Sequence, residues 1–533
     1  MSNNYNKQYI NGVWRDGSSE QVYDNINPFD NEVICRIKLA NRDDIDEAYN
    51  AAKTAQKQWA KSSAEERKQV LGRAAQIMMS RKDEIVALMV KETGASYVKT
   101  MSEFMAAAGS IMSAIEYVDL MFKPQVFAGQ IPGKENHVFR YPLGVIGVIN
   151  AFNFPLYMAM RVVAPAVAAG DAIVIKPDTQ TYMSGGPIVA EIFEQAGLPQ
   201  GIVNVVGYDI AEVGDYMIEH PVPRIISFTG STGVGRHIGE LCGKNLKRAS
   251  LELGGNNPFV VLEDADLDQA VNAAVFSKYM NSGQVCICTN RFLVHRKHYD
   301  AFVERFAERS KQVAFGNPAD PRVVIGPLIN ERQIQKVLGI AEAAKQEGAR
   351  LVLEGQRIGN VVTPFIFADV DPKSQLAGTE IFGPIATIIP FDTDEEALSI
   401  ANDTEYGLSS AVFTTDPDRA MTFAAAIESG MTHVNDTTIN MDMNAPFGGE
   451  KASGIGRYHA RSVSRSSQRP NGFRFKRKSV SSRSNNIPFL WGFLDIEKPW
   501  RHDAPRLFAC LFISYSSTKH SIFRLMYLLI NLA

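Results

Sequence analysis

Residues 145–176 read VIGVINAFNFPLYMAMRVVAPAVAAGDAIVIK, and this stretch decides the fold class. It begins with the apolar run Val145–Ile149, continues through a helical pattern near Ala159–Ala169, and ends with the apolar run Ala172–Ile175. Two short, fully apolar runs separated by a helix are typical of parallel strands that are covered on both faces. The stretch therefore predicts a β-α-β unit in an α/β protein.

The same alternation of apolar runs and helices continues along most of the chain. Helical periodicity comes first, at Asp43–Trp59 and Glu65–Thr93. The first sheet is expected to continue with strands at Val203–Val206 and Arg224–Phe228 and with helices near Ser184–Ala196 and Ala211–Glu219. A second series follows Pro258, with strands at Phe259–Leu262, Arg291–His295, Ala386–Phe391 and Ser409–Thr414 and helices at Leu267–Tyr279, Tyr299–Val313 and Thr393–Asn402. The pattern predicts a doubly wound parallel sheet and a second α/β domain, without an internal repeat.

The bulk composition excludes several classes of protein. With 533 residues, of which 45% are hydrophobic and 21% charged, the chain is long enough for two or three domains. A net charge of −3 gives no reason to expect nucleic acid as a partner. Met1–Gly17 is polar and lacks the apolar core of a secretory signal, and the body of the chain has no run of about 20 apolar residues. We therefore expect a protein that does not span a membrane.

The five cysteines indicate a reducing compartment and no metal. An odd number of widely spaced cysteines is not the pattern of a disulfide framework, so a cytoplasmic location fits. Cys286 and Cys288 form C-x-C rather than the C-x-x-C of common zinc sites, and no cluster of His and Cys completes a ligand set.

Two segments at expected strand ends are candidates for cofactor binding. TGSTGVG (229–235) joins the strand ending at Phe228 to a helix expected from Arg236, and its glycines would let backbone N–H groups approach a phosphate. The spacing differs from G-x-G-x-x-G, and an ordinary strand-to-helix connection explains the segment equally well. Lys176 ends the strand Ala172–Ile175, where doubly wound sheets bind ligands, although a solvated surface lysine is the simpler interpretation.

Three further residues are candidates for catalysis. Glu252 lies among apolar residues and glycines in LELGGNNP (251–258). Burial there would raise the pKa of its carboxyl and suit a general base, while an ion pair with a basic neighbour is the alternative. Cys286 follows the glycine turn of SGQVC (282–286) near an expected helix start, which would lower the pKa of its thiol. A buried structural cysteine is the alternative, and Cys288 fits that description. Asn153 could donate its amide to an oxyanion or simply form a turn before Phe-Pro.

Together and in this order, these segments resemble the aldehyde dehydrogenase superfamily. The motifs that carry the resemblance are NFP (153–155), KP (176–177), FTGST (228–232), LELGG (251–255), GQVC (283–286), EIFGP (380–384) and PFGGEKASGIGR (446–457). The resemblance covers about residues 8–458.

The resemblance implies an NAD- or NADP-dependent enzyme that oxidises an aldehyde to a carboxylic acid. It assigns Cys286 as the nucleophile, and the Asn153 amide and the Cys286 backbone N–H as the donors to the thiohemiacetal oxyanion. Glu252 would activate water against the resulting thioester, which favours hydrolysis over transfer to coenzyme A. The cofactor contacts implied are Lys176 with the adenosine ribose, Gly230 and Ser231 with the pyrophosphate, Glu380 with the nicotinamide ribose and Phe382 with the nicotinamide ring.

Two departures from the family pattern bear on specificity. Where the family often reads KPSE, the chain reads KPDT (176–179), and the neutral Thr179 would repel a 2′-phosphate less than glutamate does. NADP is therefore expected to be accepted as well as NAD. In the helix after Asn153, Arg161-Val162 replaces the common Trp-Lys pair. Tyr157 and Arg161 are expected to face the substrate tunnel. With the similarity of the whole body, they resemble the bacterial benzaldehyde and vanillin dehydrogenases, which implies an aromatic aldehyde.

The resemblance also divides the chain. Residues 1–120 and 139–254 would form the dinucleotide-binding domain, and residues 255–443 the catalytic domain. Residues 121–138 and 444–458 would be oligomerisation and bridging segments, the former in a small flap, and the family implies a homodimer or homotetramer. Residues 459–533 hold 13 Lys and Arg against 3 Asp and Glu, with an apolar end that polar residues interrupt. We interpret them as an aberrant basic tail without evolved structure; a basic membrane anchor is the alternative.

The tail lacks a strand that the family normally has, which reads like F-T-x-x-x-W-I-S-V and pairs across the subunit interface. One lost nucleotide near Ala460 would convert the family pattern into the sequence seen here, so our hypothesis is a frameshift. Met121–Val138 would then lose its partner strand, and weak or misassembled oligomers are expected. Besides an active aldehyde dehydrogenase, two alternatives are a folded but catalytically impaired product of a frameshifted gene and a membrane-tethered dehydrogenase.

Overall fold

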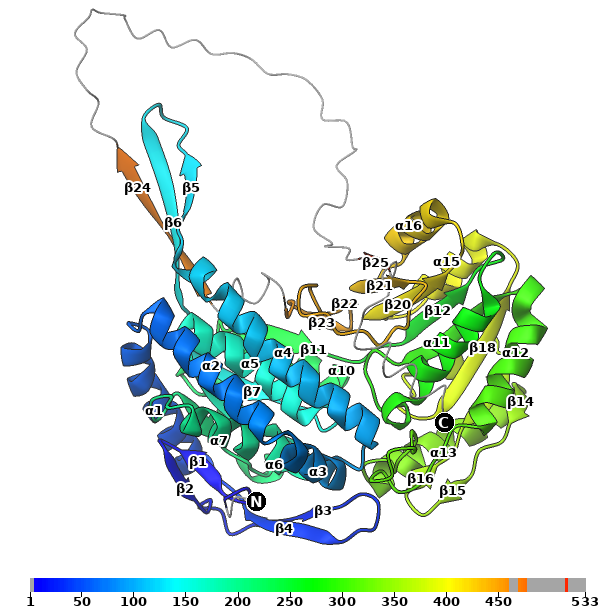
Figure 1. Ribbon diagram of the computed structural model, residues 1–533, viewed down its shortest axis with the longest axis horizontal. Coiled ribbons are helices and arrows are strands. Elements are labelled where there is room, and N and C mark those ends of the chain that lie inside the picture. The colour runs from blue at the N-terminus through cyan, green and yellow to red at the C-terminus, as the bar shows by residue number, and fades with distance from the viewer. Residues whose placement is uncertain (1–3, 460–467, 477–512, 516–533) are drawn as a thin grey trace, which may run out of the picture.

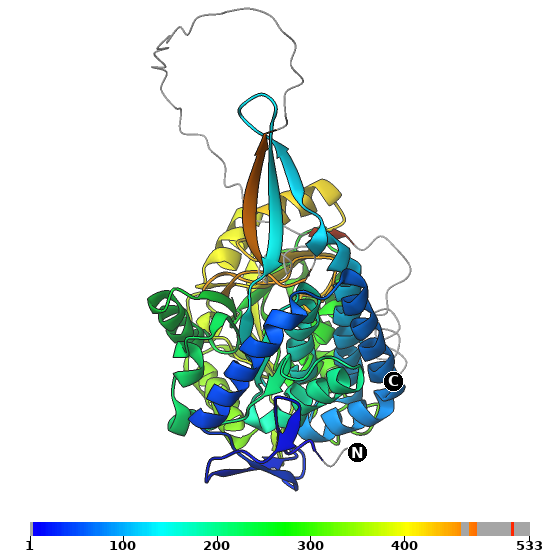
Figure 2. The ribbon, with the colours of Figure 1, turned by 90° about the vertical axis from the view of Figure 1, so that its left-hand side faces the viewer.

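The computed structural model describes residues 4–459, 468–476 and 513–515, the last two segments as backbone only. Two eight-stranded sheets, each flanked by helices, lie side by side, and a narrow three-stranded flap projects beyond them (Figures 1 and 2). This architecture confirms the predicted α/β class, with a doubly wound sheet, a second α/β unit and a small flap.

The first sheet has the strand order β2-β1-β9-β8-β7-β10-β11-β23. The strands from β9 to β11 are parallel, and their winding along the chain reverses at β7. Doubly wound sheets bind their ligands at such a reversal. The bounds are β1 (Gln8–Ile10), β2 (Val13–Arg15), β7 (Val145–Ile149), β8 (Ala172–Lys176), β9 (Val203–Val205), β10 (Pro223–Thr229), β11 (Arg248–Glu252) and β23 (Gly454–Ile455).

The helices around this sheet follow the predicted periodicity with one difference. The stretch Glu65–Thr93 is divided into two helices, because Arg81 leaves helical geometry while its guanidinium binds Glu84 and Glu191. The bounds are α1 (Arg42–Trp59), α2 (Ala64–Ser80), α3 (Lys82–Thr93), α4 (Tyr97–Phe122), α5 (Pro155–Ala169), η1 (Thr179–Thr181), α6 (Tyr182–Gly185), α7 (Pro187–Gln195), α8 (Ile210–Val213), α9 (Tyr216–Glu219) and α10 (Thr232–Lys244), with a separate hairpin of β3 (Val22–Ile26) and β4 (Val33–Lys38).

The second sheet has the order β14-β17-β18-β13-β12-β20-β21-β25 and is parallel except for β14. Its strands are β12 (Asn257–Val261), β13 (Thr289–His295), β14 (Arg350–Leu353), β17 (Phe365–Ala368), β18 (Ile385–Phe391), β20 (Ser409–Phe413), β21 (Met431–Val434) and β25 (Ile513–Tyr515). The helices are α11 (Leu267–Tyr279), η2 (Met280–Gly283), α12 (Arg296–Lys311), α13 (Glu331–Gln346), α14 (Gln375–Gly378), α15 (Asp394–Asn402) and α16 (Pro417–Ala426). Short pairs complete this half: β15 (Arg357–Ile358) with β16 (Val361–Val362), and β19 (Tyr406–Gly407) with β22 (Glu450–Lys451).

The chain passes from the first sheet to the second between β11 and β12, neither of which is an edge strand. β11 ends at Glu252, and after four residues the chain enters β12 at Asn257. The carboxyl ends of the first sheet's strands therefore lie next to the amino ends of the second sheet's strands. Alternate residues of β12 belong to separate cores, Val260 to one and Phe259 and Val261 to the other, as expected for a strand covered on both faces.

The flap corrects one prediction. β5 (Gln125–Ala128), β6 (Lys134–Pro142) and β24 (Gln468–Lys476) form an antiparallel sheet, in which β24 pairs with the whole of β6. The prediction that Met121–Val138 loses its partner strand is therefore wrong, because a segment of the tail takes that edge. Such pairing uses backbone groups, which a basic segment supplies as well as an apolar one. Another tail segment, β25, pairs with β21. The rest of the tail, including the proposed frameshift near Ala460 and the candidate anchor, lies outside the described residues.

One helix of the described part, α4, is long and apolar enough to cross a membrane, judged by length and composition alone. It packs against α2 and α5, and it buries side chains that include Phe104, Ile111 and Val118.

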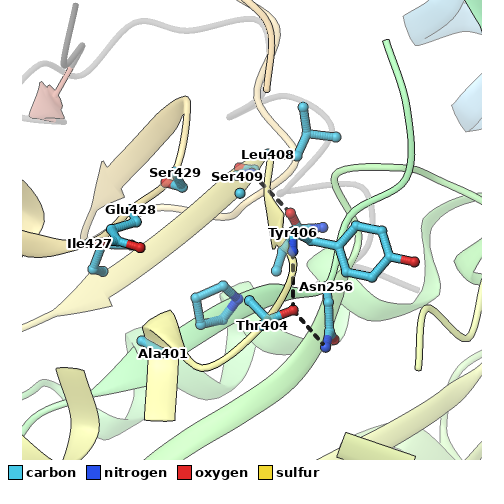
Figure 3. A pocket seen from close by; sticks show the side chains of 12 residues that line it. Asn256, Ala401, Thr404, Tyr406, Leu408, Ser409, Ile427, Glu428 and Ser429 are labelled. Atoms are coloured by element: carbon cyan, nitrogen blue, oxygen red, sulfur yellow. Dashed lines mark hydrogen bonds between the residues drawn. The ribbon is translucent and has the colours of Figure 1, made fainter. Parts of the chain in front are cut away.

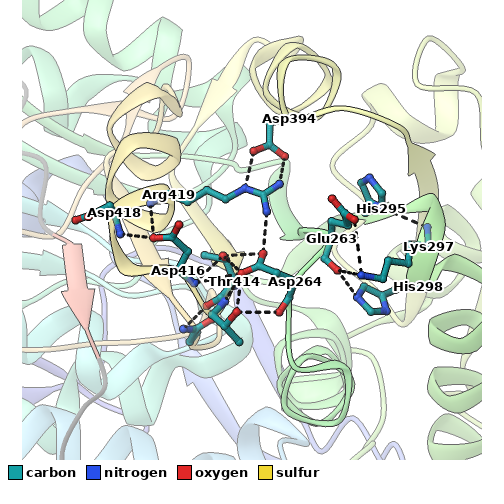
Figure 4. A network of polar contacts seen from close by, with 12 residues as sticks. Glu263, Asp264, His295, Lys297, His298, Asp394, Thr414, Asp416, Asp418 and Arg419 are labelled. Atoms are coloured by element: carbon teal, nitrogen blue, oxygen red, sulfur yellow. Dashed lines mark hydrogen bonds and ion pairs between the residues drawn. The ribbon is translucent and has the colours of Figure 1, made fainter.

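Asp264 fastens the end of β12 to the start of α16 (Figure 4). Its carboxylate accepts hydrogen bonds from the Thr415 backbone N–H at 2.8 Å and from the Thr414 hydroxyl, and it pairs with Arg419 at 2.9 Å. Burial alone would raise the pKa of Asp264, but the hydrogen bonds from Thr415 and Thr414 outweigh burial and lower the pKa to about 2. We expect Asp264→Asn to lower the free energy of unfolding by about 1–2 kcal/mol at pH 7, measured as a lower thermal midpoint.

This contribution should depend on pH in a defined direction. The pKa of about 2 in the folded protein lies below the value of about 3.9 in an unfolded chain. The stabilisation is therefore complete above about pH 4 and is lost as the pH falls towards 2. Asp320 is a matched control, because its carboxylate binds only the exposed Arg322 two residues away, a local pair that solvent screens and that the unfolded chain can also form. Asp320→Asn should hardly change the midpoint, and equal losses in both variants would contradict the role given to Asp264.

Candidate active site

Four of the predicted site residues stand at the carboxyl ends of parallel strands in the first sheet. Lys176 is the last residue of β8 and Glu252 the last residue of β11, while Asn153 follows β7 and Gly230 follows β10. Thr229 pairs with Glu252 across β10 and β11, so the glycine turn and the candidate base lie beside each other. The structure thus brings these residues to the edge where the winding reverses.

The glycine turn after β10 is shorter than predicted. α10 begins at Thr232 rather than at Arg236. Gly235 lies inside the helix, where a Cβ atom would come within 2.2 Å of the Leu253 side chain. This glycine therefore serves the close packing of helix on strand rather than the turn.

Gly230 and Ser231 form the part of the turn that can meet an anion. A Cβ atom on Gly230 would approach the Phe228 ring to 2.4 Å, so a larger residue there would displace that ring. Ser231 is exposed at the N-cap of α10, and its hydroxyl does not cap the helix. The hydroxyl and the first N–H groups of α10 together offer donors at a positive helix end.

Lys176 and Thr179 follow each other at the end of β8. Lys176 is partly buried, against the interpretation as a solvated surface lysine, and its ammonium lies 5.6 Å from the centre of the Tyr208 ring. Burial lowers its pKa, and the carboxylates of Asp178 and Asp209 partly counteract that effect. Thr179 is the first residue of η1 and brings no negative charge to this end of the strand.

Glu252 is almost completely buried, with 1% of its surface exposed. Burial raises the pKa of Glu252 to about 7, and the positive charges of Arg161 and Arg457 only partly counteract it. The nearest Arg161 nitrogen lies 3.7 Å from a carboxylate oxygen, and neither oxygen has a hydrogen-bond partner among the described residues. The predicted rise in pKa is confirmed. A carboxyl that titrates near neutral pH with open lone pairs suits general base catalysis.

Cys286 lies in a turn between η2 and β13 and is partly accessible to solvent. No helix starts at this turn, so the predicted lowering of its thiol pKa is wrong. Burial raises the pKa of the Cys286 thiol, the Glu252 carboxylate raises it further, and Arg161 acts in the opposite direction. The thiol must therefore lose a proton to a base before it can attack. Cys288 is buried, as predicted.

Asn257, at the start of β12, holds the turn that carries Cys286, and this role was not predicted from the sequence. The side-chain amide of Asn257 donates to the carbonyl oxygens of Cys286 at 2.8 Å and of Cys288 at 2.7 Å. A Cβ atom on Gly255 would come within 2.5 Å of the Cys286 carbonyl oxygen, which explains a glycine there. The available signal for Asn257 was its place two residues after LELGG, in the segment LELGGNNP (251–258).

Asn153 directs its side-chain amide at the same turn. It is buried, and its Nδ2 donates to the carbonyl oxygen of Gln284, two residues before Cys286, at 3.1 Å. Because an amide nitrogen carries two hydrogens, one donor remains for an oxygen atom bound beside Cys286.

A buried ion pair, also missed in the sequence, fixes the start of α5 after Asn153. Glu103 on α4 accepts hydrogen bonds from the backbone N–H groups of Leu156 at 2.9 Å and Tyr157 at 3.3 Å. Lys99, one turn earlier, binds Glu103 at 2.6 Å, and neither side chain is more than 1% exposed. Two opposite charges four residues apart in an apolar helix were the signal.

Glu380 and Phe382 reach the site from the loop before β18. The Glu380 carboxylate accepts a hydrogen bond from the Gly255 backbone N–H at 3.0 Å, and burial raises its pKa. A Cβ atom on Gly254 would come within 2.5 Å of that carboxylate, so both glycines of LELGG bring Glu380 close. Phe382 adopts φ 55°, which is uncommon outside glycine, and its ring packs edge-on against Phe152.

A separate, small pocket lies beside the start of β12 (Figure 3). Asn256, Thr404 and Tyr406 are among its lining residues, and none of the candidate site residues lines it. Among the described residues, no group of three or more His, Cys, Asp and Glu side chains could hold a metal ion.

Comparisons with known proteins identify the family. A sequence profile of the Aldehyde dehydrogenase family matches residues 14–468. Benzaldehyde dehydrogenase YfmT of Bacillus subtilis is 46% identical over 85% of this chain and 93% of that protein. A vanillin dehydrogenase of Corynebacterium glutamicum is 43% identical over 85% of this chain and 94% of that protein. The crystal structure of an NAD-dependent benzaldehyde dehydrogenase from Corynebacterium glutamicum matches with a TM-score of 0.81 and 38% identity, covering 89% of this chain and 99% of that one. The chain belongs to the aldehyde dehydrogenase family, whose members oxidise aldehydes with NAD or NADP.

Removing the Asn153 amide should slow the reaction without weakening substrate binding. We expect Asn153→Ala to lower kcat by about 10²–10³-fold, the usual cost of one oxyanion donor, because its spare N–H is then lost. The aldehyde KM should change little. Asn153→Asp keeps the shape but replaces the donor with an acceptor, so it should lose as much. Steady-state kinetics that show kcat within threefold of wild type in both variants would rule out this role.

Proposed function

We propose that the protein oxidises an aromatic aldehyde to its carboxylic acid, with Cys286 as nucleophile, Glu252 as general base and Asn153 as oxyanion donor. The observation that carries this proposal is the convergence of the three side chains on one turn. Asn153 donates to the carbonyl of Gln284 beside Cys286, and Glu252 lies close enough to raise the pKa of the thiol.

The reaction has two halves that share one sulfur atom. Glu252 takes the thiol proton and passes it to solvent, the Cys286 sulfur bonds to the aldehyde carbon, and the oxyanion accepts a hydrogen bond from Asn153. A bound nicotinamide cofactor supplies the acceptor for the hydride of that carbon, and the sulfur is then part of a thioester. In the second half, Glu252 removes a proton from water, the water oxygen bonds to the acyl carbon, and the C–S bond breaks with its electrons returning to Cys286.

The edge of the first sheet fits a dinucleotide. The glycine at 230 and the uncommitted Ser231 hydroxyl at the start of α10 suit a pyrophosphate, and the Lys176 ammonium suits a ribose hydroxyl. Glu380 would hold the nicotinamide ribose, with Phe382 next to the ring. Because Thr179 carries no charge, we expect NADP as well as NAD to be accepted.

Aromatic side chains support the choice of substrate. Tyr157, Phe447 and Tyr458 surround the Arg161 guanidinium beside Glu252, which gives this side of the site flat apolar surfaces. Stacked and edge-on contacts with such surfaces favour an aromatic ring over a flexible chain. The relatives named as benzaldehyde and vanillin dehydrogenases point the same way.

The test is the appearance of reduced cofactor from purified protein. We expect benzaldehyde and its ring-hydroxylated analogues to give a higher kcat/KM than hexanal or acetaldehyde, with NAD and with NADP. Equal or better use of the aliphatic aldehydes would overturn the aromatic specificity while leaving aldehyde oxidation intact. A lack of reduced cofactor with every aldehyde would overturn the whole assignment.

The division of labour within the chain is also part of the proposal. Residues 1–120 and 139–254 would bind the dinucleotide, residues 255–443 would carry the nucleophile, and the flap and residues 444–458 would serve assembly. Val126, Phe127 and Ile131 on the flap are each more than half exposed, which supports burial against a second copy. The family implies a homodimer or homotetramer in the cytoplasm, and the pairing of β24 along β6 supports this assembly over the weak or misassembled oligomers expected from the altered tail. A monomer in light scattering would contradict it.

A further inference from the structure

Arg161 is a buried cation that the reaction described above does not use. It lies on α5, one turn after Tyr157, with 2% of its surface exposed. One of its terminal nitrogens donates to the Thr229 hydroxyl at 2.9 Å, and its Nε has no partner within the described residues. A buried charge without full compensation lowers the stability of the fold, so we expect the Arg161 charge to have a function.

Aromatic rings hold the guanidinium in place. Its central carbon lies 4.2 Å from the centre of the Tyr458 ring, 5.5 Å from Phe447 and 5.6 Å from Tyr157. The faces of such rings attract a cation, and they keep it from swinging out to solvent. Tyr458 is itself fixed by a hydrogen bond of 2.8 Å between its hydroxyl and that of Ser227. The positive charge therefore stays beside Glu252.

The separation from Glu252 is informative. At 3.7 Å the guanidinium is too far to donate a normal hydrogen bond, which needs about 2.7–3.2 Å. It is close enough for a strong attraction between opposite charges in a buried site. Both oxygens of Glu252 thus keep their lone pairs while the carboxylate still has a cation next to it.

We propose that Arg161 is a positioning residue for the hydrolytic half-reaction: it keeps the buried Glu252 carboxylate ionised and leaves both of its oxygens open to the attacking water. The proposal rests on the proposed function of Glu252 as general base. Direct hydrogen bonding would have ionised the carboxyl equally well, but it would have occupied the lone pair that must accept the proton of water.

The other groups around the pair do not supply this charge. Burial raises the pKa of the Cys286 thiol and of the Tyr157 hydroxyl, so both are neutral. Burial lowers the pKa of His459 to about 3, so that imidazole is neutral too. Arg457 is the second cation that faces Glu252, from the segment after β23, but its guanidinium binds the carbonyl oxygens of Gly449 and Gly456 and the Glu450 carboxylate. Arg161 is therefore the dominant charge acting on the base.

The test separates hydride transfer from hydrolysis. Arg161→Met removes the charge at similar length, and Arg161→Lys keeps a charge on a shorter group. With an aromatic aldehyde and saturating NAD, we expect the first turnover of Arg161→Met to release the same amount of NADH as wild type, about one per subunit, but at a lower rate because Arg161 also lowers the pKa of the Cys286 thiol. Steady-state kcat at pH 7 should fall about 5- to 50-fold, because the pH at which kcat rises increases by about one to two units. Arg161→Lys should move the rise in the same direction by less.

A double-mutant cycle identifies the group through which Arg161 acts. In a Glu252→Gln background, Arg161→Met should have almost no further effect on hydrolysis, because there is no carboxylate left to ionise. If kcat of the variants that fold rises at the same pH as kcat of wild type, the proposal is overturned. A fully additive loss of hydrolysis in the double mutant would overturn it as well. If Arg161→Met does not fold, Arg161→Lys alone decides by the direction of its shift. Loss of the first-turnover NADH in wild type would instead refute the proposed function.

Discussion

Cys286→Ala should abolish aldehyde oxidation, with kcat/KM reduced by at least about 10⁴-fold for every aldehyde tested. Hydride leaves readily only from the tetrahedral carbon that a nucleophile has created, and the alanine methyl group cannot form that bond. The Asn153 amide and the cofactor residues remain in place, so binding of the cofactor should persist. Measurement of NADH formation, with NAD binding followed separately by fluorescence quenching, tells loss of chemistry from loss of fold.

Cys288 is the matched control for Cys286. It lies two residues away, is buried, and its backbone carbonyl is held by the same Asn257 amide. Cys288→Ala should keep kcat/KM within about threefold, because removing one buried sulfur costs packing rather than chemistry. Activity that survives in Cys286→Ala and disappears in Cys288→Ala would identify Cys288 as the nucleophile and overturn the assignment.

The sequence predicted the sheets well because buried parallel strands are continuous apolar runs. β7, β8, β10 and β13 lie within two residues of their expected bounds. The start of α10 was predicted four residues too late, because a glycine can serve either a turn or close packing. Gly235 was assigned to the turn, but it packs on Leu253 inside α10. The pairing of β24 with β6 could not be predicted either, because it is made by backbone hydrogen bonds, which do not depend on which side chains the strand carries.

The raised pKa of Glu252 was predictable because burial follows from its apolar neighbours in the sequence. The pKa of Cys286 was not, since it depends on Glu252 and Arg161, which reach the thiol from β11 and α5. Two of the residues missed in the sequence, Asn257 and Glu103, act on groups far along the chain. Asn257 holds a carbonyl 29 residues away, and Glu103 holds an N–H group 53 residues away.

Glu252→Gln should stop the reaction after its first half. We expect steady-state kcat to fall by about 10²–10⁴-fold. Each active site should still release about one NADH in the first turnover, but more slowly, because Glu252 no longer takes the thiol proton. Glutamine keeps the shape of the side chain but cannot take a proton from water, so the thioester on Cys286 should accumulate. Rapid-mixing absorbance measures the first turnover, and intact-protein mass spectrometry should show one added acyl group. Complete turnover without a trapped acyl group would exclude Glu252 as the base for hydrolysis.

The pH dependence gives the same residue a second, independent test. Because the carboxylate is the active form of a base and its pKa is about 7, wild-type kcat limited by hydrolysis should rise between pH 6 and 8 and then level off. The residual rate of Glu252→Gln should lose this rise. Glu92 is the matched control, since burial also raises its pKa to about 7, while its carboxylate accepts hydrogen bonds from the backbone N–H groups of Met183 and Ser184. Glu92→Gln should therefore lower stability and keep the rise near pH 7, and a rise that disappears in Glu92→Gln instead would place the titrating base outside the active site.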